Sequence, residues 1–272
     1  MMELFVRELG AGSPLVILHG LYGMSDNWLT PGRQLAERYH VLLPDQRNHG
    51  RSPHHPRHDY PALAADVEEM LDRRKLHQTV LLGHSMGGKA AMWFALQHPQ
   101  QVKALIVADI APRTYSREES RSYARHEAIL AAMSKIELSH YRSRNEVAAA
   151  LAGAIPEERI RLFLLKNLAR NKEGRFFWRL NVEVLRRNLP AIMAGPADDP
   201  TLAGARYEGP VLFLRGGRSP YVSDEDIPLI RRFFPKAQLV TLEDAGHWLH
   251  AERPEAFLEK ITDFLQEAEH SI

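Results

Sequence analysis

The sequence predicts an α/β fold in which a doubly wound, mostly parallel β-sheet carries an inserted cap of helices. Short apolar runs alternate with segments of helical spacing, which is the pattern of a layered α/β domain. The alternation stops after one run and resumes about a hundred residues later. The chain has 272 residues, 44% of them hydrophobic, which is enough for one substantial core.

The apolar runs are short, and several end at glycine or aspartate. Such runs are typical of parallel strands that are buried on both faces. We expect strands at Leu15–Leu18, Val41–Leu43, Val80–Leu82, Ala104–Val107, Val211–Leu214 and Gln238–Leu242. Apolar residues at helical spacing predict helices at Trp28–Arg38, Ala62–Arg73, Gly87–Gln97, Asp226–Phe233 and Pro254–Glu267.

The interruption lies in residues 113–188, which read as helices without a strand-like run. A stretch rich in proline, glycine and aspartate, Pro190–Pro210, then leads back to the sheet. We therefore expect a core formed by residues 1–112 and 189–272, and a helical cap at 113–188. The cap holds 16 Lys+Arg against 9 Asp+Glu, whereas the rest of the chain holds 19 against 25. The predicted cap is basic and the core acidic.

The strongest local signal is Gly83-His84-Ser85-Met86-Gly87, which stands between a strand pattern and a helix pattern. This context is typical of a nucleophile elbow, a strained turn that leaves no room for a Cβ at Gly83 or Gly87. The turn lifts the serine hydroxyl above the sheet, and the following helix directs its N-terminus at the developing negative charge. We therefore predict that Ser85 is the nucleophile.

A serine hydroxyl needs a base within hydrogen-bond reach, and His247 is the best candidate. It follows the last predicted strand and precedes the final helix. His84, beside the nucleophile, is better interpreted as a packed, hydrogen-bonded neighbour. His250 lies three residues further along and stays open as an alternative base.

The acid that orients the imidazole has two candidate positions. Asp109 ends the strand at Ala104–Val107, at the same edge of the sheet as Ser85. The loop after Val211–Leu214 has no carboxylate at the expected turn, and Asp224 comes only where a helix begins. We favour Asp109 and interpret Asp224 as an N-cap, with Asp224 as the alternative acid.

An oxyanion hole needs two backbone N–H groups. We expect one from Met86, which follows the nucleophile, and one from Leu21, in the loop after the first predicted strand. The polar segment from Asp45 to Ser52 is interpreted as a hydrogen-bonded structural loop, with a direct substrate role of Asn48 or His49 as the alternative.

Composition excludes several classes of protein. The chain has no cysteine, which rules out disulfides, thiolate metal sites and a thiol nucleophile. A net charge of +1 gives no field that would collect nucleic acid or a membrane. The histidines at 54, 55 and 58 are interpreted as a solvated loop rather than a metal site. The N-terminus lacks a signal-peptide pattern and no apolar run could span a membrane, so we expect a cytoplasmic protein.

With these residues in place, the chain resembles the α/β-hydrolase superfamily over nearly its whole length, and within it the YbfF-type esterases. The resemblance rests on HGLYG with the following SDNW, on DQRNHGRS, GHSMGG, DIAP, GGRSPYV and AGHW. It implies that the acid comes from the strand before the cap, which supports Asp109. It also implies cleavage of esters and acyl thioesters, including acyl-CoA, under a helical cap. The relatives read DISP where this chain has DIAP, which leaves the carboxylate intact.

We therefore expect an esterase or thioesterase that forms an acyl-enzyme on Ser85, with no cofactor or metal, acting on a small molecule as a monomer or weak homo-oligomer. A perhydrolase or carbon–carbon hydrolase would share the same residues, and a non-catalytic ligand-binding protein would share the fold. Dehalogenases and epoxide hydrolases of this fold place an aspartate at the elbow, which Ser85 argues against. The apolar clusters Leu162–Leu165 and Phe176–Trp178 either line an acyl pocket or pack the cap. The cap's basic excess either attracts an anion such as the phosphates of coenzyme A or forms a solvated surface.

Overall fold

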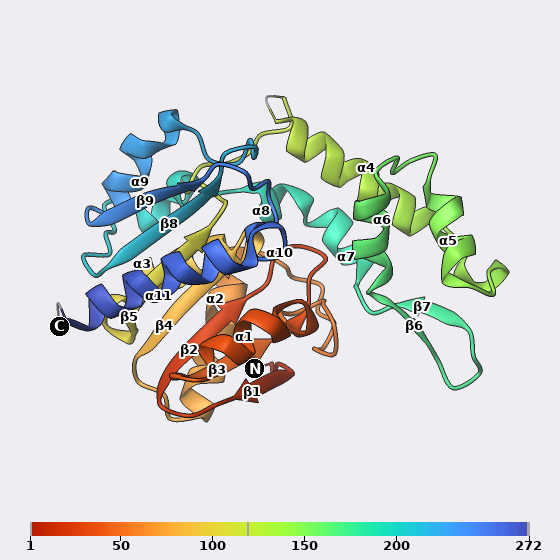
Figure 1. Ribbon diagram of the computed structural model, residues 1–272. Coiled ribbons are helices and arrows are strands. Elements are labelled where there is room, and N and C mark those ends of the chain that lie inside the picture. The colour runs from red at the N-terminus through yellow and green to blue at the C-terminus, as the bar shows by residue number, and fades with distance from the viewer. Residues whose placement is uncertain (1, 119, 271–272) are drawn as a thin grey trace.

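A computed structural model describes residues 2–118 and 120–270 of the chain. Its centre is a seven-stranded sheet in the order β1-β3-β2-β4-β5-β8-β9 (Figure 1). All neighbours pair in parallel except β1 and β3. The strands are β1 (Val6–Leu9), β2 (Ser13–Leu18), β3 (Tyr39–Pro44), β4 (Thr79–His84), β5 (Val102–Ala108), β8 (Val211–Gly216) and β9 (Ala237–Leu242). The predicted fold class is confirmed.

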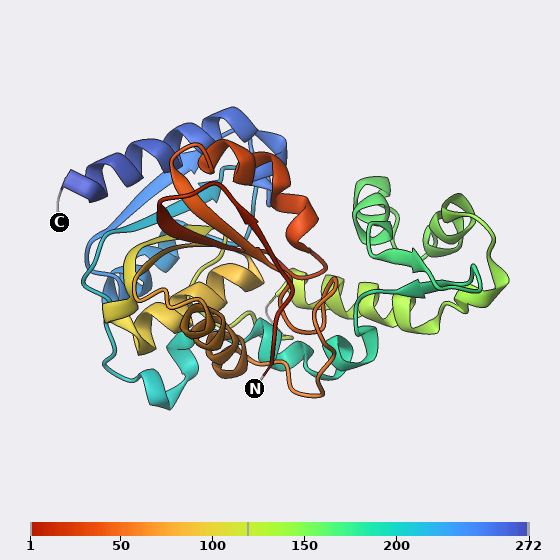
Figure 2. The ribbon, with the colours of Figure 1, turned by 90° about the horizontal axis from the view of Figure 1, so that it is seen from below.

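Helices cover both faces of this sheet, as Figures 1 and 2 show. Alternate strand residues such as Val16 and Leu18 pack with α2 and α3, whereas Leu15 and Ile17 pack with α1 and α11. This period of two follows from the pleat of a strand. The core helices are α1 (Leu29–Leu35), α2 (Tyr60–Arg73), α3 (Met86–Gln97), α9 (Ile227–Phe233), α10 (Leu249–Glu252) and α11 (Pro254–His270).

The first strand, β1, was not predicted. Its four residues pair antiparallel with β3 at the edge of the sheet, and two of them, Arg7 and Glu8, are charged, with Glu8 exposed and the other three residues partly buried. A short edge strand of this kind carries no continuous apolar run, which was the signal used for the other six strands.

The segment between β5 and β8 leaves the sheet and forms a lobe at one end of the molecule (Figure 2). It contains α4 (Arg121–Lys135), α5 (Arg144–Leu151), α6 (Glu158–Leu165), α7 (Val182–Arg187) and α8 (Leu189–Met193). Its interior is apolar and continuous with one of the two core clusters. It therefore packs on the core instead of standing apart from it.

The expectation that residues 113–188 hold no strand is wrong. A small hairpin of β6 (Leu168–Arg170) and β7 (Phe176–Trp178) extends from this segment. Its turn uses Gly174 at a φ of 77°, a conformation that glycine adopts without strain. Three-residue strands are too short to show an alternation of polar and apolar side chains, which is why the pattern did not predict them.

Candidate active site

Ser85 stands in the turn between β4 and α3, with φ 54° and ψ −120°. A positive φ is unusual for a residue with a side chain and is a local strain. The backbone here is crowded, because a Cβ on Gly83 would lie 2.2 Å from the carbonyl oxygen of Gly87, and one on Gly87 would lie 2.2 Å from that of Leu18. The glycines flanking Ser85 are therefore required by close approach, as the sequence predicts.

The side chain of His247 lies between Ser85 and Asp109. Its Nε2 is 3.1 Å from Ser85 Oγ, and its Nδ1 is 2.8 Å from Asp109 Oδ2. An ionised carboxylate only accepts hydrogen bonds, so Nδ1 carries the proton and Nε2 is free to accept the serine proton. This is the arrangement required of a nucleophile, a general base and an orienting acid.

Asp109 is fully buried and also has a positive φ, 54°. Its backbone N–H donates to the carbonyl oxygen of Leu214, and its Oδ1 accepts from the N–H of Gly216 at 3.0 Å. The hydroxyl of Ser219 donates to Oδ2. The end of β8 and the loop after it, which lacks a carboxylate, thus each supply a donor to the carboxylate that follows β5. Sequence reasoning did not single out Ser219.

Asp224 is exposed and pairs with Arg215 at 2.6 Å. The expected N-cap role of Asp224 is wrong, because Ser223 caps this 3-10 turn in a capping box with Asp226. The sequence placed the helix start correctly but assigned the cap to the neighbouring residue. Asp109, and not Asp224, is the carboxylate on the Nδ1 side of His247.

The loop after β2 turns directly against Ser85. The N–H of Gly23 donates to the carbonyl oxygen of Gly20 at 2.9 Å, and Tyr22 has a φ of 65°. A Cβ on Gly20 would lie 3.2 Å from the Cβ of Ser85. Leu21 lies in this turn, and Met86 begins α3. The backbones of both predicted oxyanion residues therefore flank the serine.

The polar loop after β3 is held by hydrogen bonds and is largely buried. The carboxylate of Asp45 accepts from the N–H groups of Ser25 at 2.6 Å and Arg51 at 2.8 Å. Arg47 pairs with Asp66 on α2 at 2.6 Å. Among the described residues, neither Asn48 nor His49 lines the cavity beside Ser85. This agrees with a structural loop and gives no support to a substrate role.

The two histidines close to Ser85 and His247 in the sequence, His84 and His250, have packing roles. His84 Nε2 donates to the backbone carbonyl of His247 at 2.7 Å, and burial keeps the pKa of His84 well below its usual range. His250 stacks on Trp28 with ring centroids 4.1 Å apart, and burial lowers its pKa to about 3. The described contacts therefore place His247, and not His250, at the serine.

The interpretation of the histidine cluster as a solvated loop holds for two of its three members. His54 and His55 are exposed, whereas His58 is fully buried, with its Nε2 3.4 Å from the sulfur of Met86. Burial lowers the pKa of His58 to about 3. Across the described residues, no cluster of three or more His, Cys, Asp or Glu side chains could hold a metal ion.

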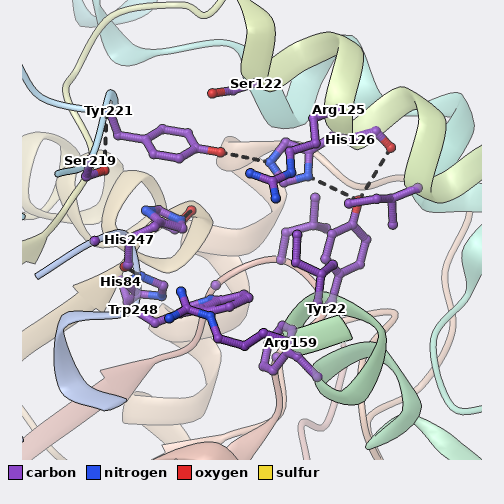
Figure 3. Close-up of a pocket in the computed structure, with 18 of the residues that line it drawn as sticks. Tyr22, His84, Ser122, Arg125, His126, Arg159, Ser219, Tyr221, His247 and Trp248 are labelled. Carbon is purple, nitrogen blue, oxygen red and sulfur yellow. Dashed lines mark hydrogen bonds between the residues drawn. The ribbon is translucent and has the colours of Figure 1, made fainter. Parts of the chain in front are cut away.

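A cavity of about 560 Å³ opens above Ser85, between the core and the inserted segment. Figure 3 shows a chain of hydrogen bonds along its wall, from Tyr221 to His126 and on to Tyr22, with lengths of 3.1 and 3.1 Å. Tyr221 also stacks on His247, with centroids 4.1 Å apart. Sequence analysis quoted Tyr22 and Tyr221 within two motifs but gave neither a role, and it did not single out His126, because the three side chains meet only in the folded chain.

The two apolar clusters of the inserted segment have mostly a packing role. Phe163 lines the cavity and contacts Trp248, with ring centroids 5.2 Å apart. Leu162 and Phe177 are instead exposed, at 56% and 42%. Leu164 is buried in the core cluster. Of the predicted acyl-pocket candidates, Phe163 is therefore the one that reaches the cavity.

Several arginines stand around the cavity, which gives it a basic rim. Arg125 pairs with Glu157 at 2.5 Å, and Arg159 pairs with Glu252 at 2.7 Å. The guanidinium of Arg159 also lies over the ring of Trp248. Arg121 and Arg218 line the same cavity. The two glutamates offset part of the positive charge. Only Glu157 of the two lines the cavity, against four arginines, so the charge of the lining is positive.

The chain is similar to known proteins over most of its length. A family model described as alpha/beta hydrolase fold matches residues 13–254. The chain belongs to the α/β-hydrolase fold family. Within this family it is 36% identical to the esterase YbfF of Escherichia coli K12 over 94% of both chains. It is 40% identical to a Xenopus laevis protein named sn-1-specific diacylglycerol lipase ABHD11, over 94% of this chain and 81% of that protein.

A solved structure named marine microorganism esterase has a similar fold. It superimposes with a TM-score of 0.92 and is 44% identical, over 97% of this chain and 100% of that one. The resemblance to YbfF-type esterases stated from the motifs is thus confirmed at the level of whole chains. Within residues 2–118 and 120–270, no helix is both long and apolar enough to cross a bilayer.

Proposed function

We propose that this α/β hydrolase is a serine esterase that cleaves small carboxylic esters through an acyl-enzyme on Ser85. The observation that carries the proposal is the position of His247, within hydrogen-bond distance of both Ser85 and Asp109. The relatives named esterase and lipase support an enzyme that hydrolyses esters.

The proposed reaction uses these groups in two half-reactions. His247 takes the proton of Ser85 as its Oγ bonds to the ester carbonyl carbon, and the N–H groups of Leu21 and Met86 bind the resulting oxyanion. His247 then gives the proton to the leaving oxygen as the ester bond breaks. Asp109 keeps the imidazole in its Nδ1–H tautomer and stabilises the imidazolium. Water, deprotonated by His247, attacks the acyl-enzyme and releases the acid and Ser85.

Thioesters are proposed as a second substrate class of the same site. The acyl transfer is identical, and a thiol leaves more readily than an alcohol. The basic rim of the cavity supports binding of a thiol that carries phosphates, because guanidinium groups bind phosphate oxygens strongly. Perhydrolysis and carbon–carbon hydrolysis use the same three residues, and no contact in the cavity favours either over ester hydrolysis.

The proposal is tested with a serine-directed phosphonate and p-nitrophenyl acetate. We expect the wild type to be labelled stoichiometrically at residue 85, located by peptide mass, and to hydrolyse the ester. Ser85→Ala should lose both, with a rate lower by at least about 1000-fold. Ser134→Ala, which removes a hydroxyl from α4, serves as the matched control and should keep both. A wild type that neither reacts with phosphonate nor turns over esters would be a binding protein and not an esterase.

A further inference from the structure

Ser85 borders two cavities of very different size. The large one holds about 560 Å³ and the small one about 20 Å³. Ser85, Leu21 and Tyr221 belong to the walls of both. His247 lines only the large cavity, whereas Met86 lines only the small one. The two cavities therefore meet at the nucleophile, the large one beside His247 and the small one beside Met86.

The lining of the small cavity is mainly apolar surface, and hydrogen bonds hold the wall opposite Ser85. Ile110, Ile192 and Met193 line it, and each of the three is at most 5% exposed. Lys89, 1% exposed, donates from Nζ to the backbone carbonyl of Met193 at 2.9 Å and to that of Ala194. These bonds join α3 to the end of α8. Hydrogen bonds thus connect the wall formed by Ile192 and Met193 to α3, the helix that begins directly after Ser85.

The chemistry assigns a substrate fragment to each cavity. His247 must protonate the leaving oxygen, so the leaving group lies on the His247 side, where the large cavity is. The carbonyl oxygen points to the N–H groups of Leu21 and Met86. The remaining substituent of the carbonyl carbon is the acyl chain, which is then directed away from His247, toward the cavity that Met86 lines.

We propose that the small cavity is the acyl subsite and the large one the subsite of the leaving alcohol or thiol. This inference rests on the proposed esterase function and specifies its substrate class as short-chain acyl esters of bulky alcohols. A void of about 10–15 Å³ in this measure holds one water molecule. A volume of about 20 Å³ therefore accepts a methyl group of acetate or, with slight adjustment, the ethyl group of propionate.

Two isomeric esters test the assignment directly, because hexyl acetate and methyl heptanoate have the same composition and the same scissile bond. Acid release is followed by titration at constant pH. We expect a kcat/KM at least about tenfold higher for hexyl acetate, since pocket fit of methylene groups discriminates by such factors. Equal rates, or a preference for methyl heptanoate, overturn the subsite assignment and leave the esterase function standing. Cleavage of neither ester, with no phosphonate label on Ser85, refutes the esterase function itself.

Two side-chain truncations locate the subsites. Met193→Ala enlarges the small cavity and should raise the ratio of p-nitrophenyl hexanoate to p-nitrophenyl acetate turnover by about tenfold. Phe163→Ala enlarges the large cavity from the inserted segment and should leave this ratio within about twofold, because the alcohol is the same in both esters. If Met193→Ala does not fold, Ile192→Ala tests the same wall. A shift of acyl preference in Phe163→Ala alone contradicts the proposal.

Discussion

Ser219 holds the carboxylate of Asp109 from a loop that has no acid of its own. The carboxylate accepts three hydrogen bonds, from the N–H of Gly216, the hydroxyl of Ser219 and Nδ1 of His247, while the backbone N–H of Asp109 donates to Leu214. Donors from the end of β8 and from the loop after it therefore hold the acid that follows β5 in contact with His247. In this chain, the hydroxyl of Ser219 holds the carboxylate of Asp109, and that carboxylate holds the ring of His247.

The first prediction concerns Ser219→Ala. A hydrogen bond to a charged group contributes about 1.5–3 kcal/mol, and its loss lets the carboxylate move away from His247. We expect kcat/KM for p-nitrophenyl acetate to fall about tenfold or more, with KM changed less than twofold. Ser134→Ala again serves as the control, since Ser134 bonds to Glu183 and neither residue lines the cavity. Unchanged kcat in Ser219→Ala would show that Gly216 alone is enough to hold Asp109.

At the scale of elements, helix α4 links the inserted segment to both sides of the candidate site. Neutral His126 on α4 has one ring nitrogen that donates and one that accepts, and the hydroxyls of Tyr221 and Tyr22 are their partners. Burial lowers the pKa of His126 to about 3, which keeps the ring neutral. Tyr22 belongs to the turn after β2 that lies against Ser85, and Tyr221 stacks on His247. One helix thus contacts both halves of the site.

The second prediction is that His126→Phe loosens this contact. The phenyl ring has nearly the volume of the imidazole but cannot hydrogen-bond to the hydroxyls of Tyr22 and Tyr221. We expect this loss to lower the free energy of unfolding by about 1–3 kcal/mol. Urea unfolding measures this loss, and kcat/KM should fall with it. In a double-mutant cycle, Tyr221→Phe combined with His126→Phe should cost clearly less than the sum of the single changes. Strict additivity would mean that the two residues are not coupled.

The sequence predicted elements wherever a periodic signal was strong. Six strands and five helices of the core agree with the structure within a few residues. The edge strand β1 and the β6–β7 hairpin were missed, since their stability comes from one pairing partner and not from an apolar run. The cap residue at the start of the turn before α9 was misassigned by one position, because serine and aspartate cap helices about equally well.

At the scale of the whole molecule, the candidate site gathers residues from distant parts of the chain. Ser85, Asp109 and His247 could be proposed from sequence, because each follows a predicted strand and parallel strands end at one edge of a sheet. The chain of Tyr22, His126 and Tyr221 could not, since it depends on how the inserted segment packs over the core. The two cavities at Ser85 could not be predicted from the sequence either, because residues from separate parts of the chain line them.

Buried neutral histidines make the stability of the whole molecule depend on pH. Burial lowers the pKa of His58 to about 3 and holds those of His49 and His84 well below their usual range. In the unfolded chain these groups titrate near pH 6.5. Between their unfolded and folded pKa values the unfolded state binds more protons, so stability is complete above about pH 6.5 and falls with acidification.

The third prediction is the size of this effect. His49, His58 and His84 alone remove up to about 4 kcal/mol per pH unit below pH 6, from about 1.4 kcal/mol each, and buried His126 and His250 act in the same direction. The urea midpoint should be nearly constant from pH 8 to 7 and fall steeply from pH 6.5 to 5.5. Exposed His54 and His55 provide the control, because their double replacement by glutamine should leave the pH profile unchanged. A midpoint constant down to pH 5.5 would contradict neutral burial of these rings.

The claim that joins all three scales is that the carboxylate of Asp109, and no other, serves His247 in ester hydrolysis. The direct test compares kcat/KM for p-nitrophenyl acetate in the wild type, Asp109→Asn and Asp224→Asn, each confirmed as folded by its urea midpoint. We predict a loss of about 1000-fold or more in Asp109→Asn, because an amide at this position favours the wrong imidazole tautomer. Asp224→Asn, which removes only an exposed pairing with Arg215, should stay within about twofold of the wild type. Near-normal activity of Asp109→Asn, or a large loss in Asp224→Asn, would contradict the account.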